Sequence, residues 1–345
     1  GGAGFIGSNF INRFMLLNPG CRVVNLDALT YAGNLKNLTA VEQSPNYRFV
    51  KGDIGDAVLV ASILIEEKID AVVHFAAESH VDRSITGPEI CVRTNVLGTQ
   101  ILLEESRKHW QSGSVADFRY YQISTDEVYG SLGEIGYFTE ETPLAPNSPY
   151  SASKTGADLL VRAYHETFGM PTIISRCSNN YGPYHFPEKL IPLLIANIIA
   201  EKPLPVYGDG RNVRDWLHVG DHAAAIECIL KGAKPGSVYN IGGNNEWQNI
   251  DIVNLVCDLL DSRLSRKPGA NRGLITFVKD RPGHDRRYAI DASKLKQDLG
   301  WSPAYTFETG IAETIDWYLS NQQWVTEVTS GSYRDYYRQQ YGGAA

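Results

Sequence analysis

The sequence lacks the features that mark several large classes of protein. Its five cysteines are widely spaced and contain no CxxC pair, so we expect neither a disulfide framework nor a metal site, and the thiols fit a reducing intracellular compartment. No apolar run approaches the about 18 residues that a membrane-spanning helix needs. The first residues do not resemble an export signal. These absences predict a cytoplasmic protein.

Concentrated positive charge is also missing. The formal net charge is -7 at pH 7, and lysine and arginine are scattered along the chain. A protein that binds nucleic acid normally has a concentrated basic face. We therefore expect neither nucleic acid nor a membrane as a partner, and an anionic ligand would have to meet a local group of cations.

Short apolar runs alternate with helical stretches over the 345 residues. The predicted strands are 21–26, 47–50, 71–75, 120–123, 172–176 and 238–241. This alternation predicts an α/β fold with a doubly wound parallel sheet. From Tyr181 onward, clusters of proline, glycine and aromatic residues are typical of a smaller, loop-rich lobe. The length favours two lobes that share a cleft.

Two long segments with few helix breakers, 90–109 and 151–168, are predicted to be helices. Helix faces of this length can pair two subunits. We therefore predict a homodimer.

A glycine-rich turn opens the sequence. Gly1, Gly4 and Gly7 precede an apolar helix predicted over 5–17, and glycines let the backbone approach a pyrophosphate at a helix N-terminus. Such turns are common, so the turn alone is weak evidence. The sequence begins inside this turn, and we expect a short apolar strand upstream of Gly1.

Asp27 strengthens the prediction of a dinucleotide site. It lies twenty residues beyond Gly7, at the end of the second predicted strand, where a carboxylate can bind both ribose hydroxyls of an adenosine and repel a ribose phosphate. This position favours NAD over NADP. The alternative is a strand-end aspartate that caps the next turn.

Tyr150 and Lys154 are four residues apart and share one face of a predicted helix. The ammonium can lower the phenol pKa from its ordinary value of about 10 toward neutrality. The phenolate could then remove a hydroxyl proton while a hydride leaves the same carbon. The alternative is an ordinary tyrosine beside a solvated lysine.

The segment STDEVYG from Ser124 places a hydroxyl and two carboxylates just after the strand 120–123, at the edge where open α/β sheets bind ligands. If Asp126 and Glu127 differ in protonation, the pair can act as general acid and general base. Alternatively, Thr125, Asp126 and Glu127 simply cap a helix and complement its dipole.

With these residues in hand, the sequence resembles the deoxythymidine-diphosphate-glucose 4,6-dehydratase family of extended short-chain dehydrogenases, over essentially the whole chain. The motifs that carry this resemblance are GGAGFIGSN at Gly1, DALTYAGNL at Asp27, STDEVYG at Ser124, YSASK at Tyr150, NNYGPYHFPEKLIP at Asn179 and RPGHDRRYAID at Arg281. The first and fourth are common to the superfamily, whereas the others are specific.

The resemblance implies a lyase with an internal redox cycle. Tyr150, aided by Lys154 and Thr125, would oxidise carbon 4 of the glucose while NAD takes the hydride. Glu127 would remove the proton on carbon 5, and Asp126 would protonate the departing hydroxyl of carbon 6. Return of the hydride to carbon 6 gives a 4-keto-6-deoxy sugar nucleotide, a product used in deoxysugar biosynthesis such as the rhamnose pathway.

The resemblance also implies a Rossmann domain that binds NAD over 1–178 and a mainly nucleotide-sugar-binding domain over 179–345, with segments near 212–243 returning to the first. The predicted NAD-binding residues are Gly1, Gly4, Phe5, Ile6, Gly7, Asp27, Thr30, Asp53, Ile54, Phe75, Ala76, Ala77, Ser79, Thr94, Tyr150, Lys154 and Asn180. The predicted substrate-binding residues are Ser79, His80, Ser84, Thr125, Asp126, Glu127, Asn179, Lys189, Leu190, Pro205, Tyr207, Arg214, Asn249, Arg281 and His284.

Three of the substrate-binding residues have distinct expected roles. Arg214 and Arg281 would form charge-assisted hydrogen bonds to phosphates, and Tyr207 would lie against the base. The alternatives are surface salt bridges for the arginines and core packing for the tyrosine.

Three other functions compete with this interpretation. A nucleotide-sugar 4-epimerase uses the same tyrosine, lysine and NAD but has no use for a proton-transfer pair, so the Asp126–Glu127 doublet discriminates against it. A UDP-glucose 4,6-dehydratase differs only in the nucleotide. A catalytically inactive scaffold that senses dinucleotide usually lacks the tyrosine or the lysine, and both are present here.

Overall fold

The computed structural model of the chain describes residues 1–280 and 285–329. The strands are β1 (Val23–Asp27), β2 (Tyr47–Lys51), β3 (Ala71–His74), β4 (Arg119–Thr125), β5 (Thr172–Cys177), β6 (Asn179–Tyr181), β7 (Leu204–Tyr207), β8 (Val213–His218), β9 (Val238–Ile241), β10 (Glu246–Gln248) and β11 (Ile275–Val278). The α-helices are α1 (Phe5–Leu17), α2 (Ala57–Glu66), α3 (Val81–Thr86), α4 (Pro88–Cys91), α5 (Thr99–Gln111), α6 (Pro149–Phe168), α7 (Leu190–Ile199), α8 (Val219–Gly232), α9 (Asn249–Arg263), α10 (Ser293–Leu299), α11 (Phe307–Ser320) and α12 (Gln322–Val328). The remaining helical segments are η1 (Leu35–Leu38), η2 (Val92–Gly98), η3 (Asp126–Tyr129) and η4 (Asn271–Leu274).

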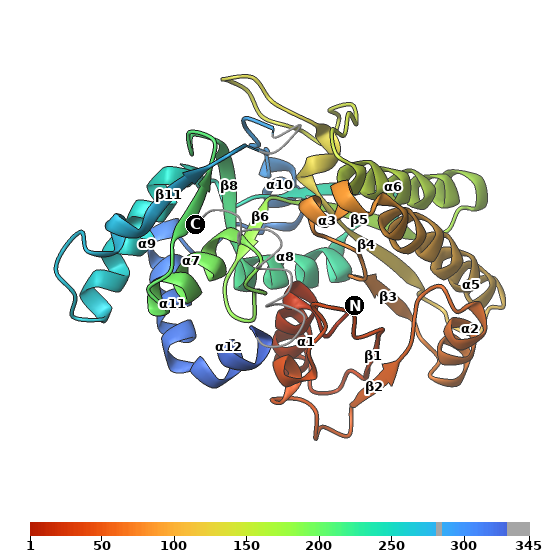
Figure 1. Cartoon of the computed structure of the whole chain (residues 1–345). Helices are drawn as coiled ribbons and strands as arrows, with labels where there is room; N and C mark the ends of the chain where they lie inside the picture. Colours follow the sequence, from red (N-terminus) through yellow and green to blue (C-terminus); the bar gives the residue numbers. More distant parts are fainter. Residues whose placement is uncertain (281–284, 330–345) are drawn as a thin grey trace.

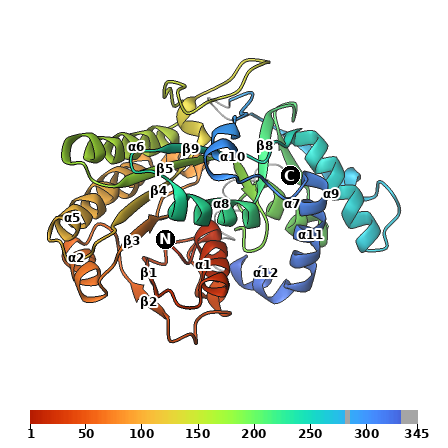
Figure 2. The same ribbon diagram turned by 180° about the vertical axis from the view of Figure 1, so that it is seen from behind.

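Parallel strands form the larger lobe, as predicted. A four-stranded sheet has its strands in the spatial order β3-β4-β5-β9, and β1 pairs with β2 beside it. Helices α2, α5 and α6 cover one face, and α1 and α8 cover the other (Figures 1 and 2). The prediction of a doubly wound α/β fold is therefore confirmed.

The helix α6 is defined at both ends by its sequence. Ser148 accepts a hydrogen bond from the Ser151 amide at 3.0 Å in a capping box, and Pro149 occupies the first turn. At the other end, Gly169 adopts a left-handed conformation with φ 67°. These signals fix the register of α6, and hence the face on which Tyr150 and Lys154 lie.

The long helix predicted over 90–109 is not a regular α-helix. It consists of α4, the π-helix η2 and α5. Within the wider π-helical turn, the Asn95 side chain accepts the Glu78 amide at 2.9 Å and donates to the Ser153 hydroxyl at 2.8 Å. The π-helix therefore ties the loop after β3 to α6, a contact that helical periodicity alone does not predict.

The smaller lobe has its own core. β6, β8 and β10 form one sheet, β7 and β11 form another, and α7, α9, α11 and α12 pack around them (Figure 1). Tyr181, Trp216 and Phe307 lie in the centre of this core. In the described part of the chain, no helix is long and apolar enough to cross a membrane.

The chain returns to the larger lobe after it has entered the smaller one. Helix α8 and strand β9 follow the first strands of the smaller lobe in sequence but belong to the larger lobe. There α8 packs against α1, and β9 pairs with β5 at the edge of the four-stranded sheet. Ile226 of α8 and Ile241 of β9 join Phe10 and Ile11 of α1 in one hydrophobic core.

Candidate active site

A cavity of about 510 Å³ lies between the lobes, a size that suits a small-molecule ligand. Its walls include residues at the carboxyl ends of the parallel strands β1 to β5, where open α/β sheets bind ligands. The glycine turn, the carboxylate pair and the Tyr150–Lys154 pair all line this cavity. Elements that are far apart in the sequence therefore meet at one site.

The glycine turn fits a dinucleotide because its backbone leaves no room for side chains. A Cβ at Gly1 would lie 2.4 Å from the Ala76 nitrogen, and one at Gly7 would lie 2.6 Å from the Gly1 carbonyl oxygen. Gly4 precedes α1 and provides no side-chain cap. The first-turn amides of α1 can therefore donate hydrogen bonds to an external anion such as a pyrophosphate.

Asp27 combines the two roles considered for it. Its carboxylate accepts the amides of Ala3 and Leu29, each at 2.8 Å, so it does cap the next turn and also holds the glycine turn in place. It lines the cavity as well. Because a carboxylate has about four acceptor positions, it can still accept the ribose hydroxyls of NAD.

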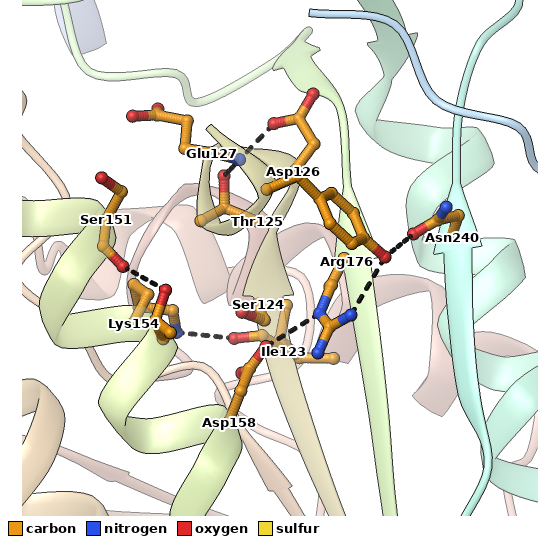
Figure 3. A network of polar contacts seen from close by, with 12 residues as sticks. Ile123, Ser124, Thr125, Asp126, Glu127, Ser151, Lys154, Asp158, Arg176 and Asn240 are labelled. Carbon is orange, nitrogen blue, oxygen red and sulfur yellow. Dashed lines mark hydrogen bonds and ion pairs between the residues drawn. The ribbon is translucent and has the colours of Figure 1, made fainter. Parts of the chain in front are cut away.

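The carboxylate pair also combines its two roles. Thr125, the last residue of β4, accepts the Glu127 amide at 3.3 Å and so caps η3, and its hydroxyl donates to Asp126 Oδ1 at 3.3 Å. In Figure 3 the side chains of Asp126 and Glu127 diverge on either side of Thr125. Both carboxylates line the cavity. The cap therefore positions the two acids rather than replacing their chemistry.

The protonation of Asp126 suits a general acid. Burial, the charge of Glu127 and that of Asp215 raise the pKa of Asp126 well above its ordinary value, although Arg214 and the Thr125 hydrogen bond oppose the shift. These effects favour the protonated form of Asp126, the form that can donate a proton.

Tyr150 and Lys154 share one face of α6, as predicted, but the pKa of the Tyr150 phenol differs from the prediction. The Lys154 ammonium donates to the Ile123 carbonyl at 2.7 Å (Figure 3). Burial and the nearby Glu127 raise the pKa of Tyr150 well above its ordinary value, and the Thr125 hydrogen bond opposes them. In the protein without NAD, burial therefore shifts this pKa in the direction opposite to the one expected from Lys154.

Most of the residues predicted to bind NAD or substrate line the cavity. They are Gly1, Gly4, Phe5, Ile6, Gly7, Asp27, Thr30, Asp53, Ile54, Phe75, Ala76, Ala77, Ser79, His80, Thr94, Thr125, Asp126, Glu127, Tyr150, Lys154, Asn179, Asn180, Lys189, Leu190, Pro205, Tyr207, Arg214 and Asn249. Their individual binding roles stay predictions.

The structure does not bring Ser84 to the cavity. Ser84 is fully buried in α3, and its hydroxyl donates to the Val81 carbonyl at 2.6 Å. Arg281 and His284 lie outside the described residues.

Two cations predicted to bind substrate are held by backbone carbonyls. Lys189 Nζ donates to the Ser79 carbonyl at 2.9 Å. Arg214 Nη2 donates to the Asp285 carbonyl at 2.8 Å, and the Arg214 guanidinium carbon lies 4.3 Å from the centre of the Tyr288 ring. Both side chains are therefore oriented at the cavity wall, where they supply positive charge.

Sequence reasoning missed Glu188. This carboxylate lines the cavity, is 5% exposed and lies 3.4 Å from Arg83 Nε. Burial raises its pKa, although Lys189 and Arg83 oppose the shift. A signal was present, because Glu188 directly precedes Lys189 in the FPEK segment, but only the lysine was singled out.

The fold and the site together define an extended short-chain dehydrogenase: a dinucleotide-binding lobe, a Tyr-Lys pair on one helix face and a second lobe that closes the cavity. The sequence profile of the GDP-mannose 4,6 dehydratase family matches residues 1–314. The dTDP-glucose 4,6-dehydratase of Xanthomonas campestris pv. campestris is 60% identical over 338 residues, 97% of this chain and 96% of the relative. The chain belongs to the dTDP-glucose 4,6-dehydratase family.

Solved structures agree with this assignment. A dTDP-glucose 4,6-dehydratase from Bacillus anthracis in complex with NAD is 49% identical with a TM-score of 0.84, and the match covers 95% of this chain and 97% of that one. A UDP-glucose 4-epimerase from Thermotoga maritima has nearly the same fold, with a TM-score of 0.82 over 93% of this chain and 98% of its own, but is only 25% identical. The fold is thus shared with epimerases, whereas the sequence similarity is greater to the dehydratase.

Proposed function

We propose that the protein converts dTDP-glucose to dTDP-4-keto-6-deoxyglucose and water, with NAD as its cofactor. The observation that carries this proposal is the pair of neighbouring carboxylates in the cavity that Tyr150 also lines: Asp126, which is buried and has a raised pKa, and Glu127. Oxidation alone needs one base, whereas elimination needs an acid and a base together.

The glycine turn would hold the pyrophosphate of NAD, and Asp27 would hold a ribose. Bound NAD supplies the hydride acceptor for carbon 4, the hydride donor for carbon 6 and a positive charge that favours the phenolate of Tyr150. The buried Lys154 ammonium adds a second positive charge on the same face of α6. Tyr150 then removes the proton of the carbon 4 hydroxyl. The hydrogen bond between the Thr125 and Tyr150 side chains stabilises the phenolate.

The elimination uses the two carboxylates in separate roles. The ketone at carbon 4 acidifies the hydrogen on carbon 5, which Glu127 removes as a proton. Asp126 gives its proton to the hydroxyl on carbon 6, which leaves as water. The carbon 5–carbon 6 double bond formed in this way accepts a hydride at carbon 6 and a proton at carbon 5, so atoms and charge balance.

Product analysis tests this function. The protein is incubated with dTDP-glucose or with UDP-glucose, and the nucleotide sugar is analysed by mass spectrometry. We expect loss of one water from dTDP-glucose, and slower dehydration of UDP-glucose. An epimerised sugar of unchanged mass would establish the 4-epimerase instead, and rapid dehydration of only the uridine substrate would correct the nucleotide.

We also propose a cytoplasmic homodimer whose subunits pair through α5, α6 and the adjoining π-helix. Exposed apolar side chains on these segments support the pairing: Val92 is 54% exposed, Leu97 47% and Leu159 53%. Sedimentation of the native chain, compared with a Leu97→Glu variant, tests the dimer. A monomeric native chain would contradict it.

The division of labour between domains is a proposal too. Residues 1–178 would bind NAD, and the remainder would bind mainly the nucleotide sugar. Segments near 212–243 would return to the first domain, which is supported by the pairing of β9 with β5.

A further inference from the structure

A buried chain of polar side chains runs beneath the active site. Arg176 Nε donates to Asp158 Oδ2 at 2.9 Å, and Arg176 Nη1 donates to the Tyr129 hydroxyl at 3.0 Å. The Tyr129 hydroxyl in turn donates to Asn240 Oδ1 at 2.8 Å. None of these side chains takes part in the reaction proposed above.

These hydrogen-bonded side chains connect the element that carries the oxidation residues with the element that carries the elimination residues (Figure 3). Asp158 lies on α6 one turn after Lys154, so it belongs to the oxidation half. Tyr129 ends η3, two residues after Glu127, so it belongs to the elimination half. Arg176, on the central strand β5, contacts both. A single guanidinium thus spans the distance between the two catalytic elements.

Stability alone does not explain this arrangement. The Asp158 side chain is fully buried and that of Arg176 is 7% exposed, and a buried ion pair is often no more stabilising than well-packed apolar residues of similar volume. The guanidinium is instead planar and rigid, so its N–H donors point in fixed directions. That geometry sets direction and distance between its partners.

Asp158 also acts on the catalytic lysine. Its charge raises the pKa of Lys154, in opposition to the burial that lowers it. The Lys154 ammonium itself donates to the Ile123 carbonyl, while Asp158 Oδ2 accepts from Arg176.

We propose that Arg176 is a positioning residue that holds the Asp126–Glu127 turn in register with the Tyr150–Lys154 helix, through Tyr129 on one side and Asp158 on the other. This inference rests on the proposed function, because it concerns the alignment of two consecutive reactions on one sugar. Oxidation takes place at carbon 4 and elimination at carbons 5 and 6, so the second set of groups must meet a substrate already fixed by the first. Catalytic groups tolerate only small displacements from the productive geometry.

Tyr129→Phe isolates this role. It removes only the hydroxyl that Arg176 and Asn240 share, and it keeps the ring that stacks on Phe138 with centroids 5.0 Å apart. Tyr121→Phe is the matched control. Tyr121 is also fully buried, and its hydroxyl donates to Ser175 at 2.8 Å between β4 and β5, but it does not reach η3.

Single-turnover measurements follow reduction of the bound dinucleotide by its near-ultraviolet absorbance, and follow elimination by the loss of water in the mass of the rapidly quenched nucleotide sugar. For Tyr129→Phe we expect elimination to slow about tenfold, while oxidation changes less than about twofold. Reduced dinucleotide then accumulates. Tyr121→Phe should lose comparable stability without this accumulation, which separates a positioning role from a merely structural one.

Arg176→Lys provides a second variant if Tyr129→Phe folds poorly. Lysine keeps a charge beside Asp158 but cannot hold Asp158 and Tyr129 in one planar fork, so the same accumulation is expected. If both variants show oxidation and elimination slowed equally, or not at all, the positioning role is wrong while the dehydratase stands. If the unmodified chain forms no keto-deoxy product, the proposed function fails instead.

Discussion

Replacing Asp126 by asparagine removes the proposed acid while keeping its shape. The amide still accepts the hydrogen bond from the Thr125 hydroxyl but cannot protonate a leaving hydroxyl near neutral pH. Loss of one general acid slows its step by about 100- to 10,000-fold, which raises the barrier by about 2.7 to 5.4 kcal/mol. Oxidation at carbon 4 does not use Asp126, so the bound dinucleotide should be reduced normally and then remain reduced.

The assay follows dinucleotide reduction in a single turnover, together with the mass of the product. Asp261→Asn is the control, because Asp261 is a buried carboxylate on α9 that accepts the amides of Gly269 and Asn271 and does not line the cavity. This control should lose stability but keep both rates. Dehydration by Asp126→Asn at the unmodified rate would refute the assignment of the acid.

Stability as a function of pH gives an independent test of Asp126. The folded protein holds a proton that the unfolded chain releases above the ordinary aspartate pKa of 3.8. The stability contributed by this proton is therefore complete below that pH and is lost as the pH rises toward the folded-state pKa. Asparagine does not titrate, so Asp126→Asn does not lose stability in this way. The free energy of unfolding of the variant should therefore increase relative to that of the unmodified chain as the pH rises. A difference independent of pH would contradict the raised pKa.

Three further predictions follow from the same structure. Tyr150→Phe should slow dinucleotide reduction by about 100-fold or more, with no reduced dinucleotide accumulating, and rapid reduction in this variant would contradict the role of the phenol. Gly7→Ala should weaken NAD binding and lower the melting temperature, because the new Cβ would lie 2.6 Å from the Gly1 carbonyl oxygen; calorimetric titration with NAD checks this, and unchanged affinity would show that the turn does not hold the cofactor. Arg176→Met should lower the free energy of unfolding by about 3 to 5 kcal/mol, because it leaves Asp158 buried and unpaired, and urea denaturation of the Arg176→Met/Asp158→Leu double variant should recover part of that loss.

The parallel sheet was predictable because its strands are short, apolar and separated by clear breaks. The strand predicted at 238–241 coincides with β9, although it follows the loop-rich segment. The helix predicted at 5–17 coincides with α1. In each case local sequence and tertiary burial favour the same structure, so periodicity was sufficient.

The π-helix and the buried polar chain were not predictable in the same way. The π-helix η2 has no compositional mark, because its wider turn is stabilised by contacts of Asn95 with Glu78 and Ser153, which are distant in sequence. Arg176 was expected only as the end of a strand. Its hydrogen-bond partners come from two other elements, α6 and η3, so its role depends on tertiary structure that local patterns do not encode.

The protonation states were also beyond local reasoning. The pKa of Tyr150 depends on how deeply the phenol is buried, and the four-residue spacing to Lys154 does not report burial. Asp126 and Glu127 have the same chemistry in sequence. The burial of Asp126 and the charges of Glu127 and Asp215 raise its pKa, and these depend on the tertiary structure.

The return of α8 and β9 to the larger lobe has a consequence for protein engineering. A fragment that stops after Cys177 would leave one edge of β5 unpaired and would uncover the side of α1 that α8 protects. Swapping contiguous halves between relatives would pack α1 and β5 of one protein against α8 and β9 of another, so we expect such hybrids to lose stability. Grafts limited to loops that line the cavity would leave the interwoven scaffold whole.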